Sequence, residues 1–211
     1  MLQHRRRRAP GRPPLKKTTS STSQIIYSAL DVKAWLARPP SAAQARPGQC
    51  PRCRTASRPV GGALGLHGHG LRDRQLRGPL AADSEPTLEV VWCRRYRCTR
   101  CRAILLVVPR GVAPRRHYSH AAIAMALALW GLMAMPEATV RERVCTWRVR
   151  TASSRGWSTV RRWAQAARTA AGPTLRQVAG RAAQIAVGRA PPSVRSAPLW
   201  AQAFAGGATM P

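Results

Sequence analysis

The stretch TLEVVWCRRYRCTRC, residues 87–101, joins a run of β-branched and aromatic residues to a C-x-x-C pair. Such residues fit a pleated, half-buried surface, so the run predicts a β-strand over 87–98. A second pair, CPRC, occupies residues 50–53, with 44 residues between the two pairs. A C-x-x-C turn presents two sulfurs on one side, and two such turns complete the tetrahedral sphere of a structural zinc ion. The sequence therefore predicts one Zn²⁺ ion, held by Cys50, Cys53, Cys98 and Cys101.

The spacer between the pairs is longer than is usual for zinc sites, but its content supports the pairing. Residues 63–78, ALGLHGHGLRDRQLRG, alternate with glycine in the manner of a strand, and residues 78–86 read as a polar loop. A strand, a loop and a second strand would bring the two cysteine pairs to adjacent hairpin ends. We therefore predict a small zinc ribbon over residues 48–108.

Other residues compete as ligands. Side chains alternate along a strand, which puts Cys93 on the face opposite Cys98 and makes it a bystander. The same alternation assigns one shared face to Leu88, Val90, Trp92, Tyr96 and Cys98. His67 and His69 have strand spacing and remain alternative ligands, although exposed histidines flanked by glycine are more common. Cys145 lies in helical sequence and is expected to be a small buried residue.

Four thiolates close the coordination sphere, so the predicted metal is structural rather than catalytic. No H-x-E motif precedes the cysteine pairs, as a nucleotide deaminase would require. No Gly-rich phosphate loop occurs either, and no Ser or Cys is paired with a base. The sequence predicts that the chain is not an enzyme.

Charge indicates the class of partner. The 211 residues contain 36 Lys and Arg against 7 Asp and Glu, a formal net charge of +29, which predicts a polyanionic partner. Nearly all these basic residues are arginines, and a GC-rich genome accounts for part of the bias. The absence of an apolar segment after the basic N-terminus predicts a cytoplasmic, nucleoid-associated protein with reduced cysteines. Residues 118–136 carry no formal charge, and we expect a buried helix there in preference to a membrane span.

Composition divides the remaining chain. Residues 1–23 are basic and almost without apolar side chains, so they are predicted to be a disordered arm. Residues 24–47 are expected to form a short helix, with Ile26, Leu30 and Ala34 near one face, and a linker that begins at Pro39. Residues 172–211 are predicted to be a tail rich in Pro and Ala, with a helix near 175–187.

Residues 115–171 are predicted to form three helices. The first begins at Ser119 as N-cap and the second at Pro136 and Glu137. The third, in WSTVRRWAQAARTA, has an apolar side made of Trp157, Val160, Trp163, Ala164 and Ala167. Its polar side consists of Ser158, Arg161, Arg162, Gln165 and Arg168. These side chains reach phosphates and base edges, which favours a helix-turn-helix recognition helix over a merely solvated basic face.

The paired cysteines, the RRYRC strand, the PRRHYS segment and the WSTVRRWAQAA helix together resemble a known bacterial arrangement. It is the zinc-ribbon plus helix-turn-helix segment of insertion-sequence transposases and of related short proteins, and the resemblance covers roughly residues 48–168. It implies recognition of duplex DNA, with catalysis left to a later RNase H-like domain. Here the seven acids are scattered, and none follows Glu142.

The resulting expectation is an α+β protein that binds double-stranded DNA. It would be an accessory or remnant of a transposase-like mobile element that lacks the catalytic core. A transposase or a second copy of the chain is a further expected partner. The alternative is a zinc ribbon that contacts protein or RNA, with helices that only support it.

Overall fold

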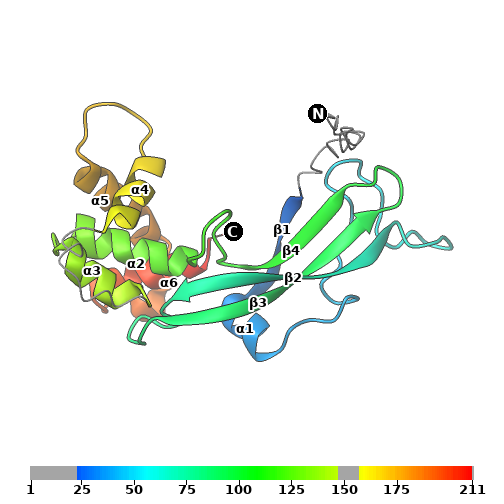
Figure 1. Ribbon diagram of the computed structural model, residues 1–211, viewed down its shortest axis with the longest axis horizontal. Helices are drawn as coiled ribbons and strands as arrows, with labels where there is room; N and C mark the ends of the chain where they lie inside the picture. The colour runs from blue at the N-terminus through cyan, green and yellow to red at the C-terminus, as the bar shows by residue number, and fades with distance from the viewer. Residues whose placement is uncertain (1–22, 147–156, 211) are drawn as a thin grey trace, which may run out of the picture.

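The computed structural model describes residues 23–146 and 157–210. It has two parts along its long axis, a four-stranded sheet and a bundle of helices (Figure 1). The chain is therefore α+β, with the sheet before the bundle, as the sequence predicts. The predicted arm lies almost wholly outside the described residues, as does the polar segment 150–156.

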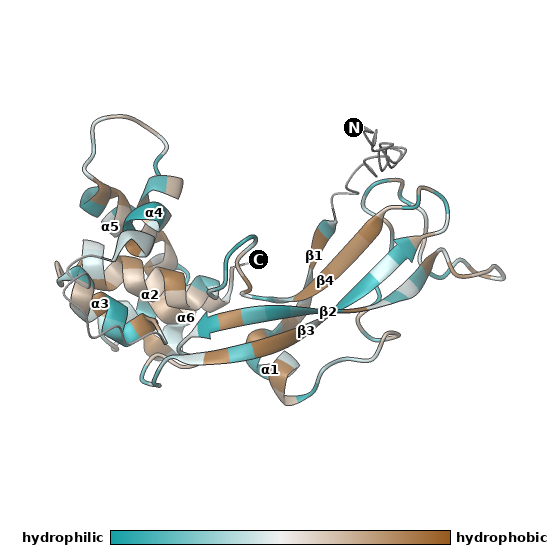
Figure 2. Cartoon of the chain, in the orientation of Figure 1, coloured by the Kyte–Doolittle hydropathy of each residue, from teal (hydrophilic) through white to brown (hydrophobic). Residues whose placement is uncertain are grey.

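The sheet has the strand order β1-β4-β3-β2. Strands β2 (Leu66–Gly78), β3 (Thr87–Cys98) and β4 (Ile104–Arg110) form an antiparallel meander, and β1 (Gln24–Asp31) pairs in parallel with β4. The predicted strand over 87–98 is confirmed. β4 is buried on both faces from Leu105 to Val108, whereas the edge strand β2 is mostly hydrophilic (Figure 2).

The helix expected near Ile26 is wrong, because residues 24–31 form β1. The apolar pair Ile25 and Ile26 lies beside Leu106 and Val107 of β4, and this distant pairing overrides the local periodicity. Helix α1 (Val32–Ala37) begins only after Asp31, whose carboxylate accepts the N–H of Ala34 at 2.8 Å, and it ends before Pro39 as predicted. Its anchor is Trp35, which is 1% exposed.

The predicted core face of β3 is only half right. Cys98 and Tyr96 are buried, but Leu88, Val90 and Trp92 are 47%, 47% and 52% exposed. In the first half of β3 the core lies on the other face, which carries Val91 and Cys93. Beyond Cys93, the loop after α1 covers the face that carries Tyr96 and Cys98. Tyr96 donates to the Ala42 carbonyl at 2.7 Å, and Arg94 donates to the Pro40 carbonyl at 2.9 Å.

The bundle is organised around α2 (His120–Gly131), which is buried from Ala121 to Trp130 except at Ile123. Ser119 caps it as predicted, accepting the N–H of Ala122 at 3.0 Å. Around α2 lie α3 (Glu137–Val144), α4 (Ser158–Ala166), α5 (Leu175–Gly188) and α6 (Leu199–Ala208). Because α2 is covered on all sides, it needs no polar face. No helix among the described residues is long and apolar enough to cross a bilayer.

The helix expected near 175–187 is confirmed as α5, but residues 172–211 are not a tail, because their helices are part of this core. Both α5 and α6 pack on α2, and they bury Ala183 and Phe204 among other residues. The packing is close because small residues face each other. A Cβ atom on Gly206 would lie 1.8 Å from the carbonyl oxygen of Ala186, and one on Gly131 would lie 2.3 Å from the amide nitrogen of Gly180. The alanine-rich composition of residues 172–211 thus serves helix packing.

The hairpin of β2 and β3 connects the two parts. At its tip the N–H of Arg77 donates to the His117 carbonyl at 2.6 Å. Gly78 has φ of +111°, and a Cβ atom there would lie 2.7 Å from the side chain of Ala122. A further contact joins the end of β4 to the C-terminal residues, where the N–H of Gly111 donates to the Met210 carbonyl at 3.1 Å. The end of the sheet that carries the turn between β3 and β4 points away from this junction (Figure 1).

Candidate metal centre

Two turns of the same geometry carry the four cysteines, and we call these turns, residues 50–55 and 98–103, the knuckles. In the first, the N–H of Cys50 donates to the Thr55 carbonyl at 2.9 Å, and that of Arg54 to the Cys50 carbonyl at 2.9 Å. In the second, the N–H of Cys98 donates to the Ala103 carbonyl at 3.0 Å, and that of Arg102 to the Cys98 carbonyl at 3.1 Å. Each knuckle therefore fixes two sulfurs by backbone bonds.

The knuckles face each other and bring the four thiols together. The Sγ atoms lie within 4.8 Å of one another, with 3.6 Å between Cys50 and Cys101 and between Cys53 and Cys98. Zinc–sulfur bonds of about 2.3 Å in a tetrahedron imply sulfur–sulfur distances of about 3.8 Å. The cluster fits a tetrahedral ion of that size. All four cysteines are free thiols.

The electrostatics of the cluster favour a cation. Hydrogen bonds from the side chain and then the backbone of Thr55 lower the pKa of the Cys53 thiol to about 6. For Cys101, a backbone hydrogen bond at Ala103 lowers the pKa, but burial and the neighbouring sulfurs outweigh it and raise the pKa to about 11. Four thiols this close cannot all ionise without a positive charge among them. A divalent ion would supply that charge, with the thiolates as its ligands.

The rival ligands lie outside the cluster. Cys93 is fully buried on the opposite face of β3, and burial raises its pKa to about 11. His67 and His69 are exposed and do not belong to the four-sulfur group. Cys145 is buried in the bundle, where it accepts a hydrogen bond from the Tyr118 hydroxyl at 3.3 Å. The interpretation of Cys93 as a bystander therefore agrees with its position.

Helix α4 places four of the five predicted DNA-binding side chains on one exposed surface, which we call the α4 polar face: Ser158, Arg161, Arg162 and Gln165. The fifth, Arg168, is also exposed but lies beyond the end of the helix, so the prediction that it belongs to this face is wrong. Behind it Trp157 and Trp163 are buried and stack edge to face with Tyr118, at centroid distances of 6.3 and 4.9 Å. Ala167, expected on the apolar side, is exposed because α4 ends at Ala166.

Glu137 of α3 lies beside the α4 polar face, and the sequence did not reveal its role there. It was expected only to begin a helix, and it does lie in the first turn of α3. Its carboxylate also accepts the N–H of Trp157 at 2.8 Å and pairs with Arg161 at 2.6 Å. Only two acids, Glu137 and Glu142, occur after residue 89, and this scarcity was the available signal. Arg168, beyond the end of α4, is engaged locally, because it donates to the Pro173 carbonyl at 2.9 Å.

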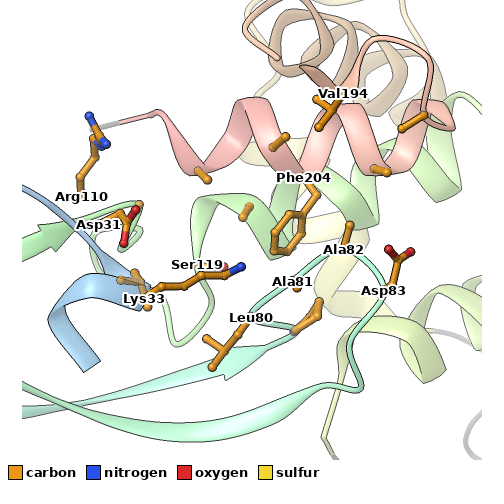
Figure 3. A pocket seen from close by; sticks show the side chains of 18 residues that line it. Asp31, Lys33, Leu80, Ala81, Ala82, Asp83, Arg110, Ser119, Val194 and Phe204 are labelled. Carbon is orange, nitrogen blue, oxygen red and sulfur yellow. The ribbon is translucent and has the colours of Figure 1, made fainter. Parts of the chain in front are cut away.

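A cavity of about 450 Å³ lies where the sheet meets the bundle. Figure 3 shows Phe204 and Leu80 among its apolar lining, with Asp31 and Arg110 to one side. Of its polar lining, Asp31 and Ser119 act as the N-caps of α1 and α2. Lys33 and Asp83 line it as well, and its described lining contains no His or Cys.

Comparison with known proteins adds no relative: no family model, curated protein or solved structure matches the chain.

Proposed function

We propose that this chain is a DNA-binding protein in which Zn²⁺ at the four-cysteine cluster is structural and the α4 polar face recognises double-stranded DNA. In this proposal the zinc ribbon and the helices correspond to the DNA-recognition part of a transposase-like mobile-element protein. The chain acts without a catalytic core of its own, as an accessory or a remnant. The resemblance in the cysteine, RRYRC and WSTVRRWAQAA segments supports this assignment.

One observation carries the proposal: α4 has a buried side anchored by two tryptophans and an opposite side made of guanidinium, amide and hydroxyl groups. Arg162 and Gln165 are the central residues of that side, and both are exposed. Arginine pairs with guanine and glutamine with adenine in the major groove, where a helix fits. A helix held rigidly from behind is suited to such contacts, because its side chains keep a fixed register.

The chemistry of the cluster supports a structural metal. Four sulfurs complete a tetrahedron, which leaves no position for substrate or water. Zn²⁺ would tie the turn between β3 and β4 to the loop that contains Cys50 and Cys53. Because the ligands must be deprotonated, metal binding and folding of this end of the sheet are coupled.

The test begins by selecting a preferred site from a random duplex library with the zinc-loaded protein. Arg162→Ala and Gln165→Ala are then titrated against the selected duplex and a scrambled duplex at two salt concentrations. Arg181→Ala, which removes an exposed arginine on α5, is the matched control. We expect each α4 variant to lose about 1–3 kcal/mol on the selected duplex and to discriminate less at one base position. The control should retain both affinity and discrimination.

The alternative is a zinc ribbon that contacts RNA or protein, with α4 as a solvated basic surface. The ion pair of Arg161 with Glu137 favours it, since it shows one arginine already engaged within the protein. If both α4 variants weaken the two duplexes equally, the helix is only a charged surface. Tighter binding of structured RNA than of any selected duplex would identify the alternative.

A further inference from the structure

The two knuckles share more than their cysteines. Residues 50–54 read CPRCR and residues 98–102 read CTRCR, so each knuckle has arginine at its third and fifth positions. Arg52 and Arg54 in the first knuckle and Arg100 and Arg102 in the second are all exposed. We call these four side chains the knuckle arginines. Their repetition in two turns of matching backbone geometry is the observation that requires an explanation.

The fifth position of each knuckle is conformationally unfavourable for arginine. Arg54 has φ of +61° and Arg102 has φ of +59°, in the left-handed region where Cβ is crowded. Glycine adopts this conformation without that strain. Two independent turns therefore keep a long charged side chain where the backbone would be better served by glycine. A strained residue held in this way points to a role outside the fold.

Neutralising the metal site explains only part of this charge. Four thiolates and one divalent cation carry a net charge of −2, and the knuckle arginines carry +4. Two positive charges therefore remain at this end of the molecule after full compensation. Among the described residues, the knuckle arginines take part in no ion pair, and the pair between Glu137 and Arg161 lies in the bundle.

We infer that the knuckle arginines bind the phosphate backbone of duplex DNA, as a second contact site separate from α4. This inference rests on the proposed function. The knuckles lie at the end of the sheet away from the bundle, so the two sites occupy opposite ends of the molecule (Figure 1). Guanidinium groups on exposed turns can reach phosphate oxygens without entering a groove, so they add affinity without reading sequence.

Salt dependence tests the inference directly, because each phosphate contact contributes about 0.9 to the slope of log K against log salt. The knuckle variant replaces all four knuckle arginines with alanine in the zinc-loaded, full-length protein. The charge-matched control replaces Arg38, Arg181, Arg189 and Arg195, which are exposed away from the knuckles. We expect the slope to become shallower by about 3 to 4 in the knuckle variant and by less than 1 in the control. An equal change of slope in the knuckle variant and the control would mean that net charge alone sets the salt dependence.

A second variant keeps the test informative if alanine disturbs the turns. Arg54→Gly with Arg102→Gly relieves the left-handed backbone, and it should retain one zinc per chain while the slope becomes shallower by about 2. Loss of zinc from this variant would assign the arginines to the metal site and overturn the inference. An unchanged slope with zinc retained would overturn it as well.

The outcomes separate this inference from the proposed function. The wild type could bind the selected and scrambled duplexes equally while the knuckle variant still shows a shallower slope of log K against log salt. In that case α4 does not read sequence, but the knuckle arginines do contact the phosphate backbone. If the α4 variants lose discrimination and the knuckle variant keeps its slope, the proposed function stands alone. Wild-type protein that ignores duplex and binds RNA with a knuckle-dependent slope would contradict the assignment to duplex DNA.

Discussion

The Glu137 carboxylate in α3 holds Arg161 in α4, with 2.6 Å between Oε1 and Nε. The side chain of Glu137 is 9% exposed and that of Arg161 60%, so the pair lies at the edge of the bundle. The second oxygen accepts the N–H of Trp157, the N-cap residue of α4, which has no side-chain cap of its own. One acid therefore places a negative charge at the positive end of the α4 dipole and also restrains an arginine of the α4 polar face.

Replacing Glu137 with Gln should separate these two effects. We expect a loss of about 1–2 kcal/mol in the free energy of unfolding, because a charge-assisted contact to Trp157 becomes a neutral one. Affinity for duplex DNA should rise at the same time, since Arg161 is released and a nearby negative charge is removed. Chemical denaturation and duplex titration measure the two quantities. A variant that loses stability and affinity together would show that the ion pair positions Arg161 for binding.

The metal site makes a prediction about two cysteines of the same strand. Zinc content should be one per chain in the wild type and should be lost in Cys98→Ser, with melting of the sheet end that carries the knuckles. Cys93→Ala should keep its zinc, because Cys93 lies outside the cluster. Alanine is the better replacement there, since Cys93 is fully buried and serine would bury a hydroxyl group. Equal zinc loss in both variants would refute the assignment of Cys93.

Two tryptophans test the change of buried face along β3. Trp35 is 1% exposed and donates its indole N–H to the Trp92 carbonyl at 3.2 Å, whereas the Trp92 side chain is 52% exposed. We expect Trp35→Ala to cost about 3–5 kcal/mol, as for a buried large aromatic, and Trp92→Ala about 1 kcal/mol or less. Denaturant midpoints of the two variants decide the matter. A comparable cost at both sites would mean that the face of Trp92 is covered in solution.

Acidification should weaken the bundle through His120. Burial lowers the pKa of His120 below its ordinary value of 6.5, and a backbone hydrogen bond with Met210 opposes this only in part. Below pH 6.5 the unfolded chain therefore binds a proton at this site that the folded chain does not. Stability should be complete above pH 6.5 and should decline below it, until the folded pKa is passed. His120→Gln removes this contribution. The melting temperatures of the wild type and of His120→Gln, measured between pH 5 and 8, should therefore converge at the acidic end.

Two glycines test the packing of α6 on α5. A Cβ atom at Gly206 would collide with the Ala186 carbonyl oxygen, whereas one at Gly188 would meet nothing within 4 Å. Gly206→Ala should therefore cost about 1–3 kcal/mol through forced separation of the helices. Gly188→Ala should be neutral or stabilising by up to about 1 kcal/mol, because alanine loses less backbone entropy on folding. If the two variants unfold alike, α6 is not held against α5 in solution.

The features that could be predicted from the sequence are those with local causes. The strand over 87–98 has a β-branched and aromatic composition, and each C-x-x-C turn brings its own two sulfurs together. The pairing of the two turns followed from the two strands between them. Helix α4 was recognisable because Val160 and Trp163 repeat on one side of a polar sequence. Its use in DNA recognition remains a prediction.

The features that were missed depend on distant parts of the chain. β1 is a strand because β4 lies beside it, and nothing near Ile26 in the sequence reports that neighbour. Alternation along β3 gave the correct period but not which face is covered, since the cover at Tyr96 comes from Ala42. The helix near 175–187 was predicted, but α6 was missed and the whole segment was taken for a tail, because alanine and glycine carry little hydropathic contrast. Their contribution lies in how closely the backbones approach.

The parallel pairing of β1 with β4 also sets the order in which the sheet can form during translation. β1 is made first, but β4 follows about 80 residues later, a delay of roughly 4–16 s at ordinary rates of synthesis. During this interval Ile25 and Ile26 have no strand to cover them, and Cys50 and Cys53 have no opposing knuckle. Once residue 110 has emerged, both β4 and the second knuckle are present. Zinc supplied to a ribosome-bound chain stalled before Cys98 should leave the sheet unformed, whereas a chain stalled well beyond Arg110 can close it.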